Sequence, residues 1–197
     1  LSDKCNANCS FCNDRLSYKV QGCNSCIRWN RSTNKIEQED FYSALEFLSN
    51  LQVMHVTFVG GNPLLEWEYL VGVADYLGSR NPNISFRVNT NGFGLNIEIA
   101  QKAKEMGISF LFTIFADSPE KYYEITGTQG LFESLTNAIN ICREFYIPYS
   151  VNLLLLESNK DYFLEMQAFV KQIGGMQLFA TEIISKTNLL KKLTTLP

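Results

Sequence analysis

Three cysteines near the amino terminus have the spacing of a metal or iron–sulfur site. Cys5, Cys9 and Cys12 form a CxxxCxxC pattern. Three thiolates in one short loop can each bind one iron of a cubane 4Fe–4S cluster, which leaves the fourth iron open to a substrate or cofactor. A closed structural zinc site instead needs a fourth ligand, which Cys23 or Cys26 would supply. The spacing by itself leaves both kinds of site open.

The remaining cysteines favour metal or redox chemistry over a disulfide scaffold. Five of the six cysteines lie within the first 26 residues, a pattern that favours a reducing, cytoplasmic compartment. Cys23 and Cys26 form a CxxC pair with three open interpretations: half of a second metal site, a redox pair or a local structural clip. Cys142 falls in an apolar helical segment and is predicted to be a core thiol.

The composition excludes several classes of protein. The chain has 197 residues, of which 46% are hydrophobic and 19% charged, as is typical of one globular domain. The formal net charge of −3 gives no basic footprint, so nucleic acid is not an expected partner. The sequence has no apolar run long enough to span a membrane and no signal peptide, so no membrane partner is predicted either.

The elements that must position the cysteines alternate between strand and helix. Strands are predicted at residues 53–59, 85–89, 108–115, 149–156 and 177–183, and helices at 39–49, 67–79, 97–106, 131–145 and 160–173. Residues 117–130 are predicted to be a broken loop. Five strands separated by helices indicate an α/β fold with a parallel sheet of right-handed βαβ units, which either stays open or curls toward a barrel.

Other side chains receive structural interpretations. His55, the only histidine, lies in a predicted core strand, and a structural role is favoured over proton transfer. Tyr122 and Tyr123 fall in the predicted loop, where packing is favoured over contact with a substrate. Phe110 and Phe112 are predicted to belong to a buried strand.

Four segments, in order along the chain, resemble the motifs of the radical S-adenosylmethionine (radical SAM) superfamily. The cysteine pattern, with Phe11 before its third cysteine, resembles the family's CxxxCxΦC signature, in which Φ is aromatic. The later matches are Gly60-Gly61-Asn62-Pro63 to a GGEP motif, Asn89-Thr90-Asn91-Gly92 to a TNG turn, and residues 115–119 and 124–132 to an SxDGP segment and a helix lead-in. The resemblance therefore covers nearly the whole chain.

The resemblance implies a fold and a set of cofactor contacts. The fold is a partial (β/α)6 barrel, with one further strand expected before Cys5, and residues 1–197 are expected to be the core domain of a longer protein with a C-terminal extension. Functional residues then follow the carboxyl ends of the strands. The implied cofactors are a 4Fe–4S cluster on Cys5, Cys9 and Cys12, and S-adenosylmethionine with contacts from Phe11, Gly60, Gly61, Asn62, Pro63, Asn89, Asn91, Asp117 and Asn152.

Three positions depart from the family's pattern. Asn62 stands in place of the usual glutamate, and its amide oxygen can accept a hydrogen bond from the cofactor's ammonium only without charge assistance. Phe115 stands where a ribose-binding serine is usual, which passes the ribose contacts to asparagines and Asp117. Thr126 stands where arginine is common, which removes a charge contact.

The closest branch in this resemblance is the peptide- and protein-modifying one, which is sulfatase-maturase-like and of SPASM type. It implies that the reduced cluster passes one electron to S-adenosylmethionine, which gives methionine and a 5′-deoxyadenosyl radical that abstracts hydrogen from a substrate. The expected substrate is a peptide or protein side chain, as for a maturase of ribosomally made peptides, and the expected electron donor is a flavodoxin or ferredoxin. No catalytic acid or base is assigned. The alternatives are a radical SAM enzyme that acts on a small molecule or nucleotide, and a non-catalytic binding protein of the same fold.

Overall fold

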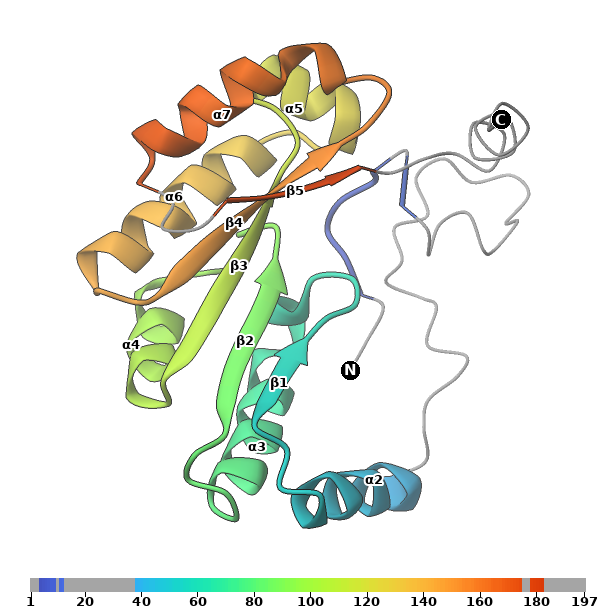
Figure 1. The fold of residues 1–197 in the computed structure, drawn as a ribbon, viewed down its shortest axis with the longest axis vertical. Coiled ribbons are helices and arrows are strands. Elements are labelled where there is room, and N and C mark those ends of the chain that lie inside the picture. Colours follow the sequence, from blue (N-terminus) through green and yellow to red (C-terminus); the bar gives the residue numbers. More distant parts are fainter. Residues whose placement is uncertain (1–3, 10, 13–37, 175–177, 183–197) are drawn as a thin grey trace, which may run out of the picture.

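The computed structural model describes residues 4–9, 11, 12, 38–174 and 178–182 (Figure 1). Cys23 and Cys26 lie outside these residues, so the interpretations of that pair stay predictions. Within the described part of the chain, five strands form one parallel sheet in the order β1-β2-β3-β4-β5. The strands are β1 (His55–Phe58), β2 (Ser85–Thr90), β3 (Ile108–Ile114), β4 (Tyr149–Leu155) and β5 (Leu178–Glu182).

Helix α2 (Gln38–Asn50) precedes β1, and the other helices connect consecutive strands. They are α3 (Trp67–Gly78), α4 (Ile97–Glu105), α5 (Pro119–Thr126), α6 (Leu131–Glu144) and α7 (Phe163–Gln172), with short 3-10 turns η2 (Pro63–Glu66) and η3 (Lys160–Tyr162). Figure 1 shows a curved sheet with α3, α4, α6 and α7 on its outer side. The predicted partial (β/α)6 barrel is thus confirmed, since each strand pairs with its neighbour in sequence after a helical crossover.

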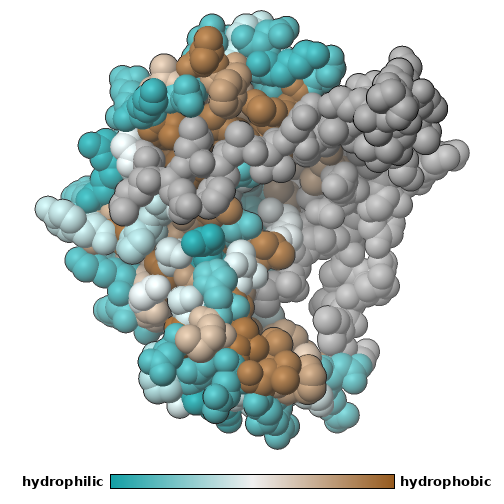
Figure 2. All heavy atoms as spheres, viewed as in Figure 1, coloured by the Kyte–Doolittle hydropathy of each residue, from teal (hydrophilic) through white to brown (hydrophobic). Residues whose placement is uncertain are grey.

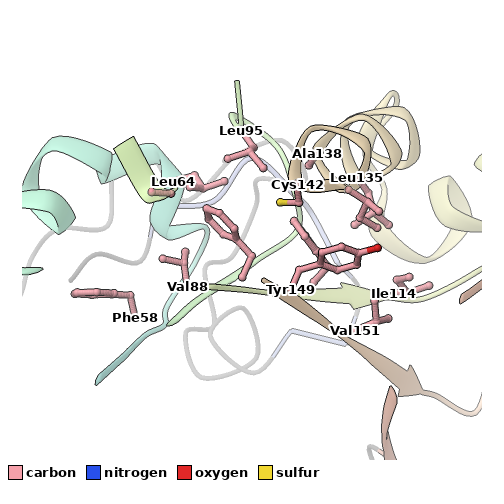
Figure 3. Close-up of a cluster of buried hydrophobic side chains, with 14 of the residues drawn as sticks. Phe58, Leu64, Val88, Leu95, Ile114, Leu135, Ala138, Cys142, Tyr149 and Val151 are labelled. Carbon is pink, nitrogen blue, oxygen red and sulfur yellow. The ribbon is translucent and has the colours of Figure 1, made fainter. Parts of the chain in front are cut away.

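The outer face of the sheet forms the hydrophobic core. Along β3, buried and half-buried residues alternate, and Phe110 and Phe112 are among the fully buried ones. Figure 3 shows Val151 of β4 and Tyr149 on the side of the strands that faces Cys142 of α6. Cys142 is confirmed as a core thiol, and burial raises its pKa from 9.0 to about 12. Such a thiol has no thiolate at neutral pH and is therefore chemically inert.

The inner face of the sheet is partly polar. Successive strand residues point to opposite faces, so the half-buried residues of β2 and β3, together with Ser150 and Asn152 of β4, face away from the helices; the apolar Leu111 is among them. In register across the sheet, Arg87 of β2 lies beside Ser109 of β3, and Thr113 of β3 lies beside Asn152 of β4. Asn89 shares this face near the end of β2. The interior therefore offers hydrogen-bonding groups toward the carboxyl ends of the strands.

The prediction of a broken loop over residues 117–130 is wrong, because α5 lies within it. Ser118 caps the amino end of α5 by accepting a hydrogen bond from the backbone N–H of Lys121, and Pro119 begins the first turn. Gly127 ends the helix in the left-handed conformation, with φ 59°. Both signals are present in the sequence, but they bracket only 8 residues, too few for a clear periodic pattern.

The predicted environments of His55 and Tyr122 are also corrected. His55 is exposed rather than in the core, because β1 has only β2 beside it in the described sheet. Both of its ring nitrogens are hydrogen-bonded, to the hydroxyls of Ser85 at 2.7 Å and Thr57 at 3.0 Å, which keeps the structural role. Tyr122 lies in α5 and is fully buried, whereas Tyr123 is exposed.

The surface of the described residues gives no sign of a membrane span, since none of their helices is both long and apolar enough to cross a bilayer. Figure 2 shows hydrophobic atoms gathered at the α2 end of the molecule, where Phe47, Leu51 and Met54 are exposed. In Figure 1, α2 lies apart from the cysteine segment, which runs past the carboxyl ends of the strands.

Candidate functional site

The cysteine segment is a loop with one buried and two half-buried thiols. Cys5 is buried and its Sγ accepts a hydrogen bond from the backbone N–H of Ala7 at 3.4 Å. Cys9 and Cys12 are half-buried, and the backbone N–H of Cys12 donates to the carbonyl of Cys9 at 3.3 Å. All three are thiols in the structure. Within the described residues no three metal-binding side chains converge on one ion. A cubane cluster has no such requirement, because each cysteine binds a different iron.

Backbone–backbone hydrogen bonds hold this loop to the barrel at two points. On one side the backbone N–H of Asn62 donates to the carbonyl of Lys4 at 2.7 Å. On the other side the backbone N–H of Asn8 donates to the carbonyl of Thr126 at 3.0 Å. The second point needs Gly127, since a Cβ there would lie 3.3 Å from the carbonyl oxygen of Asn8. The loop is therefore fixed between the turn after β1 and the end of α5.

The turn after β1 contains the Gly-Gly pair of the second motif. Gly60 and Gly61 have φ of 101° and 51°, a backbone conformation that side chains with a Cβ rarely adopt. Pro63 then begins η2, as expected of a residue with a fixed φ and no N–H. Gly60 is exposed and Gly61 half-buried, so the backbone of this turn is accessible to a ligand.

Asn62 is buried, with 1% of its surface exposed, and its side chain is bonded at both ends. Its Oδ1 accepts a hydrogen bond from the hydroxyl of Thr90 at 2.7 Å. Its Nδ2 donates to the carbonyl of Phe93 at 2.9 Å and to Oδ1 of Asn6 at 3.2 Å. The residue that replaces the family's glutamate thus joins the turn after β1 to the cysteine loop and to the turn after β2.

The turn after β2 completes this network. Asn91 accepts a hydrogen bond from the backbone N–H of Phe93 at 3.0 Å and donates through Nδ2 to Oδ1 of Asn6 at 3.0 Å. Gly92 has φ 88°, and a Cβ on it would lie 2.8 Å from Cα of Leu135 in α6. The structure therefore brings together three segments that are separated in sequence: the cysteine loop, the Gly-Gly turn and the Asn-Gly turn.

An aromatic group supports the third cysteine. The rings of Phe11 and Phe115 lie 5.1 Å apart, and Phe115 lies 5.3 Å from Tyr122. Phe115, which stands where a serine was expected, is thus the packing partner of Phe11. The hydroxyl of Tyr122 donates to the carbonyl of Thr113 at 3.0 Å. Burial raises the pKa of Tyr122 well above its usual value, and the charge of Cys9 raises it further, so the phenol stays a neutral donor.

The polar residues proposed for the ribose fall into two groups. Asn89 and Asn152 share the inner face, and Oδ1 of Asn89 is buried without a hydrogen-bond partner among the described residues. Asp117 is half-buried and accepts a hydrogen bond from Nζ of Lys121 at 2.9 Å. This hydrogen bond raises the pKa of Lys121, so Lys121 keeps its positive charge at neutral pH. Thr126, where arginine is common, uses its hydroxyl to donate to the carbonyl of Tyr122 at 2.8 Å.

Asn159 is a site-supporting residue that sequence reasoning missed. It is buried, its Oδ1 accepts from the backbone N–H of Leu156 at 2.6 Å, and its Nδ2 donates to the carbonyls of Phe115 and Leu154 at 2.8 and 2.9 Å. It therefore joins the ends of β3 and β4. No motif marks it in the sequence, where it is one of five consecutive polar residues at positions 157–161.

The residues present fit an iron–sulfur cluster with a bound cofactor. Three thiols occupy one loop that is fixed against two glycine turns. Two buried polar atoms at this end of the barrel, Nδ2 of Asn6 and Oδ1 of Asn89, have no protein partner among the described residues. Buried polar groups are normally satisfied, so an unmatched donor and acceptor here indicate that a ligand belongs between these elements.

The family model for the radical SAM superfamily matches residues 1–170. The chain belongs to the radical SAM superfamily. Members of this family use a 4Fe–4S cluster and S-adenosylmethionine, and these are the cofactors of this protein. The family and its relatives indicate an enzyme.

Two curated relatives illustrate the range of the family. An uncharacterized protein of Methanocaldococcus jannaschii is 24% identical over 180 residues, which cover 88% of this chain and 56% of that protein. The GTP 3′,8-cyclase of Clostridium acetobutylicum is 25% identical over 176 residues, which cover 86% of this chain and 49% of the cyclase. The chain thus spans about half the length of these relatives.

Solved radical SAM structures share the fold. The structure of anSMEcpe with bound AdoMet and the Kp18Cys peptide has a TM-score of 0.73 at 15% identity, covering 93% of this chain and 49% of that one. Streptococcus suis SuiB bound to the precursor peptide SuiA has a TM-score of 0.67 at 16% identity, covering 92% and 37%. At this identity the likeness establishes the barrel and no more.

Proposed function

We propose that this chain is the catalytic barrel of a radical SAM enzyme that modifies a peptide or protein side chain. The observation that carries the proposal is a set of hydrogen bonds that joins three segments. Through Asn6, the cysteine loop is bonded to Asn62 in the Gly-Gly turn and to Asn91 in the Asn-Gly turn. A cysteine loop that served only a structural metal would have no need of two open turns beside it. The cluster and S-adenosylmethionine, when bound, supply a 5′-deoxyadenosyl radical for hydrogen abstraction.

In this proposal, the cysteine loop holds the cluster through Cys5, Cys9 and Cys12. The loop is anchored at Lys4 and Asn8, so the thiols are positioned before the cluster binds. Such preorganisation matters because an iron without a protein ligand must face the cofactor rather than a fourth side chain.

The cofactor would lie across the carboxyl ends of the strands. The accessible backbone of Gly60 and Gly61 is suited to the methionyl ammonium, while Pro63 fixes the exit of that turn. The second lone pair of Asn62 Oδ1 remains for the predicted ammonium contact beside the Thr90 hydroxyl. Phe11, backed by Phe115, would pack against the adenine.

The ribose and the substrate would be bound by the polar inner face. The unmatched Oδ1 of Asn89 is an acceptor suited to a ribose hydroxyl, and Asn152 and Asn91 lie at the same end of the sheet. Asp117 would act through its second carboxylate oxygen, since Lys121 binds the first. We assign no catalytic acid or base.

The substrate class rests on similarity of fold to enzymes that were solved with peptides bound, anSMEcpe and SuiB. A flavodoxin or ferredoxin would supply the electron in the cytoplasm, and Cys23 with Cys26 would hold part of a second site. The match to a GTP cyclase supports one alternative, a small-molecule or nucleotide substrate.

The test is anaerobic reconstitution of the full-length protein with iron and sulfide, followed by S-adenosylmethionine and a reductant. We expect at least four irons per chain and release of 5′-deoxyadenosine, because the three cysteines of the loop would hold one 4Fe–4S cluster and a second site would add to it. Cys9→Ala should lose the four irons of this cluster together with the release of 5′-deoxyadenosine. Cys142→Ala is the matched control, since that thiol is in the core and should leave both unchanged. Iron loading and cofactor cleavage that survive Cys9→Ala would refute the proposed site.

A further inference from the structure

The side-chain amide of Asn6 has one orientation, which two backbone groups of Phe93 determine. One of them, the carbonyl, can only accept a hydrogen bond, and the other, the N–H, can only donate one. The carbonyl of Phe93 can only accept a hydrogen bond, so the atom of Asn62 that faces it at 2.9 Å must be Nδ2. The opposite atom of Asn62, Oδ1, then accepts the hydroxyl of Thr90 at 2.7 Å. The second proton of that Nδ2 points to Asn6 at 3.2 Å, so the facing atom of Asn6 must be its oxygen.

A second and independent chain of bonds leads to the same assignment. The backbone N–H of Phe93 can only donate, so the atom of Asn91 that faces it at 3.0 Å must be Oδ1. Nδ2 of Asn91 therefore donates to Asn6 at 3.0 Å. Two donors converge on one atom of Asn6, which is consequently its Oδ1. If the Asn6 amide were reversed, its NH2 group would face the NH2 groups of Asn62 and Asn91, and no hydrogen bond could form.

This orientation leaves an unmatched donor inside the cysteine loop. Nδ2 of Asn6 is buried and has no hydrogen-bond partner among the residues that the structure describes. Its Oδ1 is occupied by the donors from the two turns where the cofactor is proposed to bind, so Nδ2, on the other branch of the same amide, does not point at those donors. Asn6 directly follows Cys5 in the segment that carries all three thiols. A buried N–H without an acceptor costs free energy, which indicates an acceptor that belongs to the bound state.

We propose that Asn6 donates a hydrogen bond from Nδ2 to a sulfur of the 4Fe–4S cluster or its thiolates. Asn6 is then a positioning and tuning residue whose orientation is set by Asn62 and Asn91. Hydrogen bonds to cluster sulfurs stabilise the reduced, more negative state and so raise the reduction potential. The inference rests on the proposed binding of the cluster by the cysteine loop and adds a role that no motif assigns.

The test compares Asn6→Asp with Asn8→Asp in the reconstituted full-length protein. Asn6→Asp keeps an oxygen for the two donors but replaces the N–H that faces the sulfur with an anionic oxygen. Asn8→Asp adds the same charge two residues away on an exposed side chain of the same loop. The readout is the midpoint potential of the cluster without S-adenosylmethionine, from an EPR-monitored titration.

We expect the potential of Asn6→Asp to be lower than both the wild-type value and that of Asn8→Asp. Equal potentials for the two variants would overturn the proposal. So would a weakened affinity for S-adenosylmethionine with an unmoved potential, since the donor would then face the cofactor. Iron content and visible absorbance report separately whether the cluster binds at all, so failure of the proposed function is distinguished from failure of this inference.

A second measurement covers the case in which Asn6→Asp does not retain its cluster. Pulsed EPR on the reduced wild-type protein, with asparagine side chains labelled with ¹⁵N, should detect one amide nitrogen coupled to the cluster. Asn8→Asp should keep that coupling. Absence of any coupled amide nitrogen in the wild-type protein would overturn the proposal.

Discussion

At the scale of single residues, the departures from the family's motifs prove to be connected parts of this structure. Asn62 lacks the glutamate's charge but has an N–H2 group, which bonds Phe93 and Asn6. Phe115 lacks a serine's hydroxyl but packs on Phe11. Asn62 therefore gives up the charge of a ligand contact and Phe115 its hydroxyl, and each adds a contact within the protein that supports the cysteine loop.

Restoring the family's acid at Asn62 should destabilise this protein. In Asn62→Glu a carboxylate would face two acceptors, the carbonyl of Phe93 and Oδ1 of Asn6, in a site that is 1% exposed. We expect the free energy of unfolding to fall by about 3 kcal/mol or more, because a buried charge would be left unpaired. Urea denaturation measures this change.

Asn137→Glu is the matched control, since Asn137 is exposed on α6 and should tolerate the same replacement with little change in stability. A variant Asn62→Glu that was as stable as wild type, with tighter binding of S-adenosylmethionine, would show that this side chain faces the cofactor instead of the loop.

At the scale of elements, glycines set how closely the turns approach their neighbours. Gly92 ends β2 with φ 88°, and its position against α6 leaves no room for a Cβ, which would lie 2.8 Å from Cα of Leu135. Because Asn91 reaches the cysteine loop from the same turn, the packing of α6 against β2 also determines the position of Asn6.

Replacement of Gly92 by alanine should be strongly destabilising. The strained backbone and the contact with α6 together should lower the free energy of unfolding by about 2–5 kcal/mol. In Gly72→Ala, on the exposed face of α3 with no atom within 4 Å of the new Cβ, we expect stabilisation by about 0.5–1 kcal/mol. Chemical denaturation of both variants checks this; equal stabilities would contradict the close approach.

The sequence predicted the elements well where the periodic pattern was long. All five strands and the long helices were anticipated, because alternation of apolar residues carries that signal. The short helix α5 was missed, since 8 residues give too few repeats and its Ser-Pro start was attributed to a motif. The burial of His55 was misjudged because sequence does not reveal which strand lies at an edge of the described sheet.

The sequence predicted which segments form the site but not the side-chain hydrogen bonds that join them. Ordered motifs indicated that the cysteine loop and both glycine turns meet, because the turns follow predicted strands and the loop was expected to follow a further one. The hydrogen bonds through Asn6 and the tie made by Asn159 were not predictable, since each depends on side-chain orientation across long sequence separations.

At the scale of the whole molecule, the residues that stabilise the barrel and the residues of the candidate site lie on different faces of the sheet. The outer face of the sheet carries the core beneath the helices, and the polar inner face leads to the loops at the carboxyl ends of the strands (Figures 1 and 3). This division lets the loops vary while the barrel stays folded, which agrees with a family whose members include a GTP cyclase and a cyclopropyl synthase.

In the proposed function, three cysteines leave one iron open for S-adenosylmethionine between the two glycine turns. The most direct measurement is the EPR spectrum of the reduced, reconstituted full-length protein with and without S-adenosylmethionine. We expect the cofactor to shift the cluster's signal, because it would bind the open iron. An unchanged spectrum at saturating cofactor, or a protein that binds zinc in place of iron, would contradict the account.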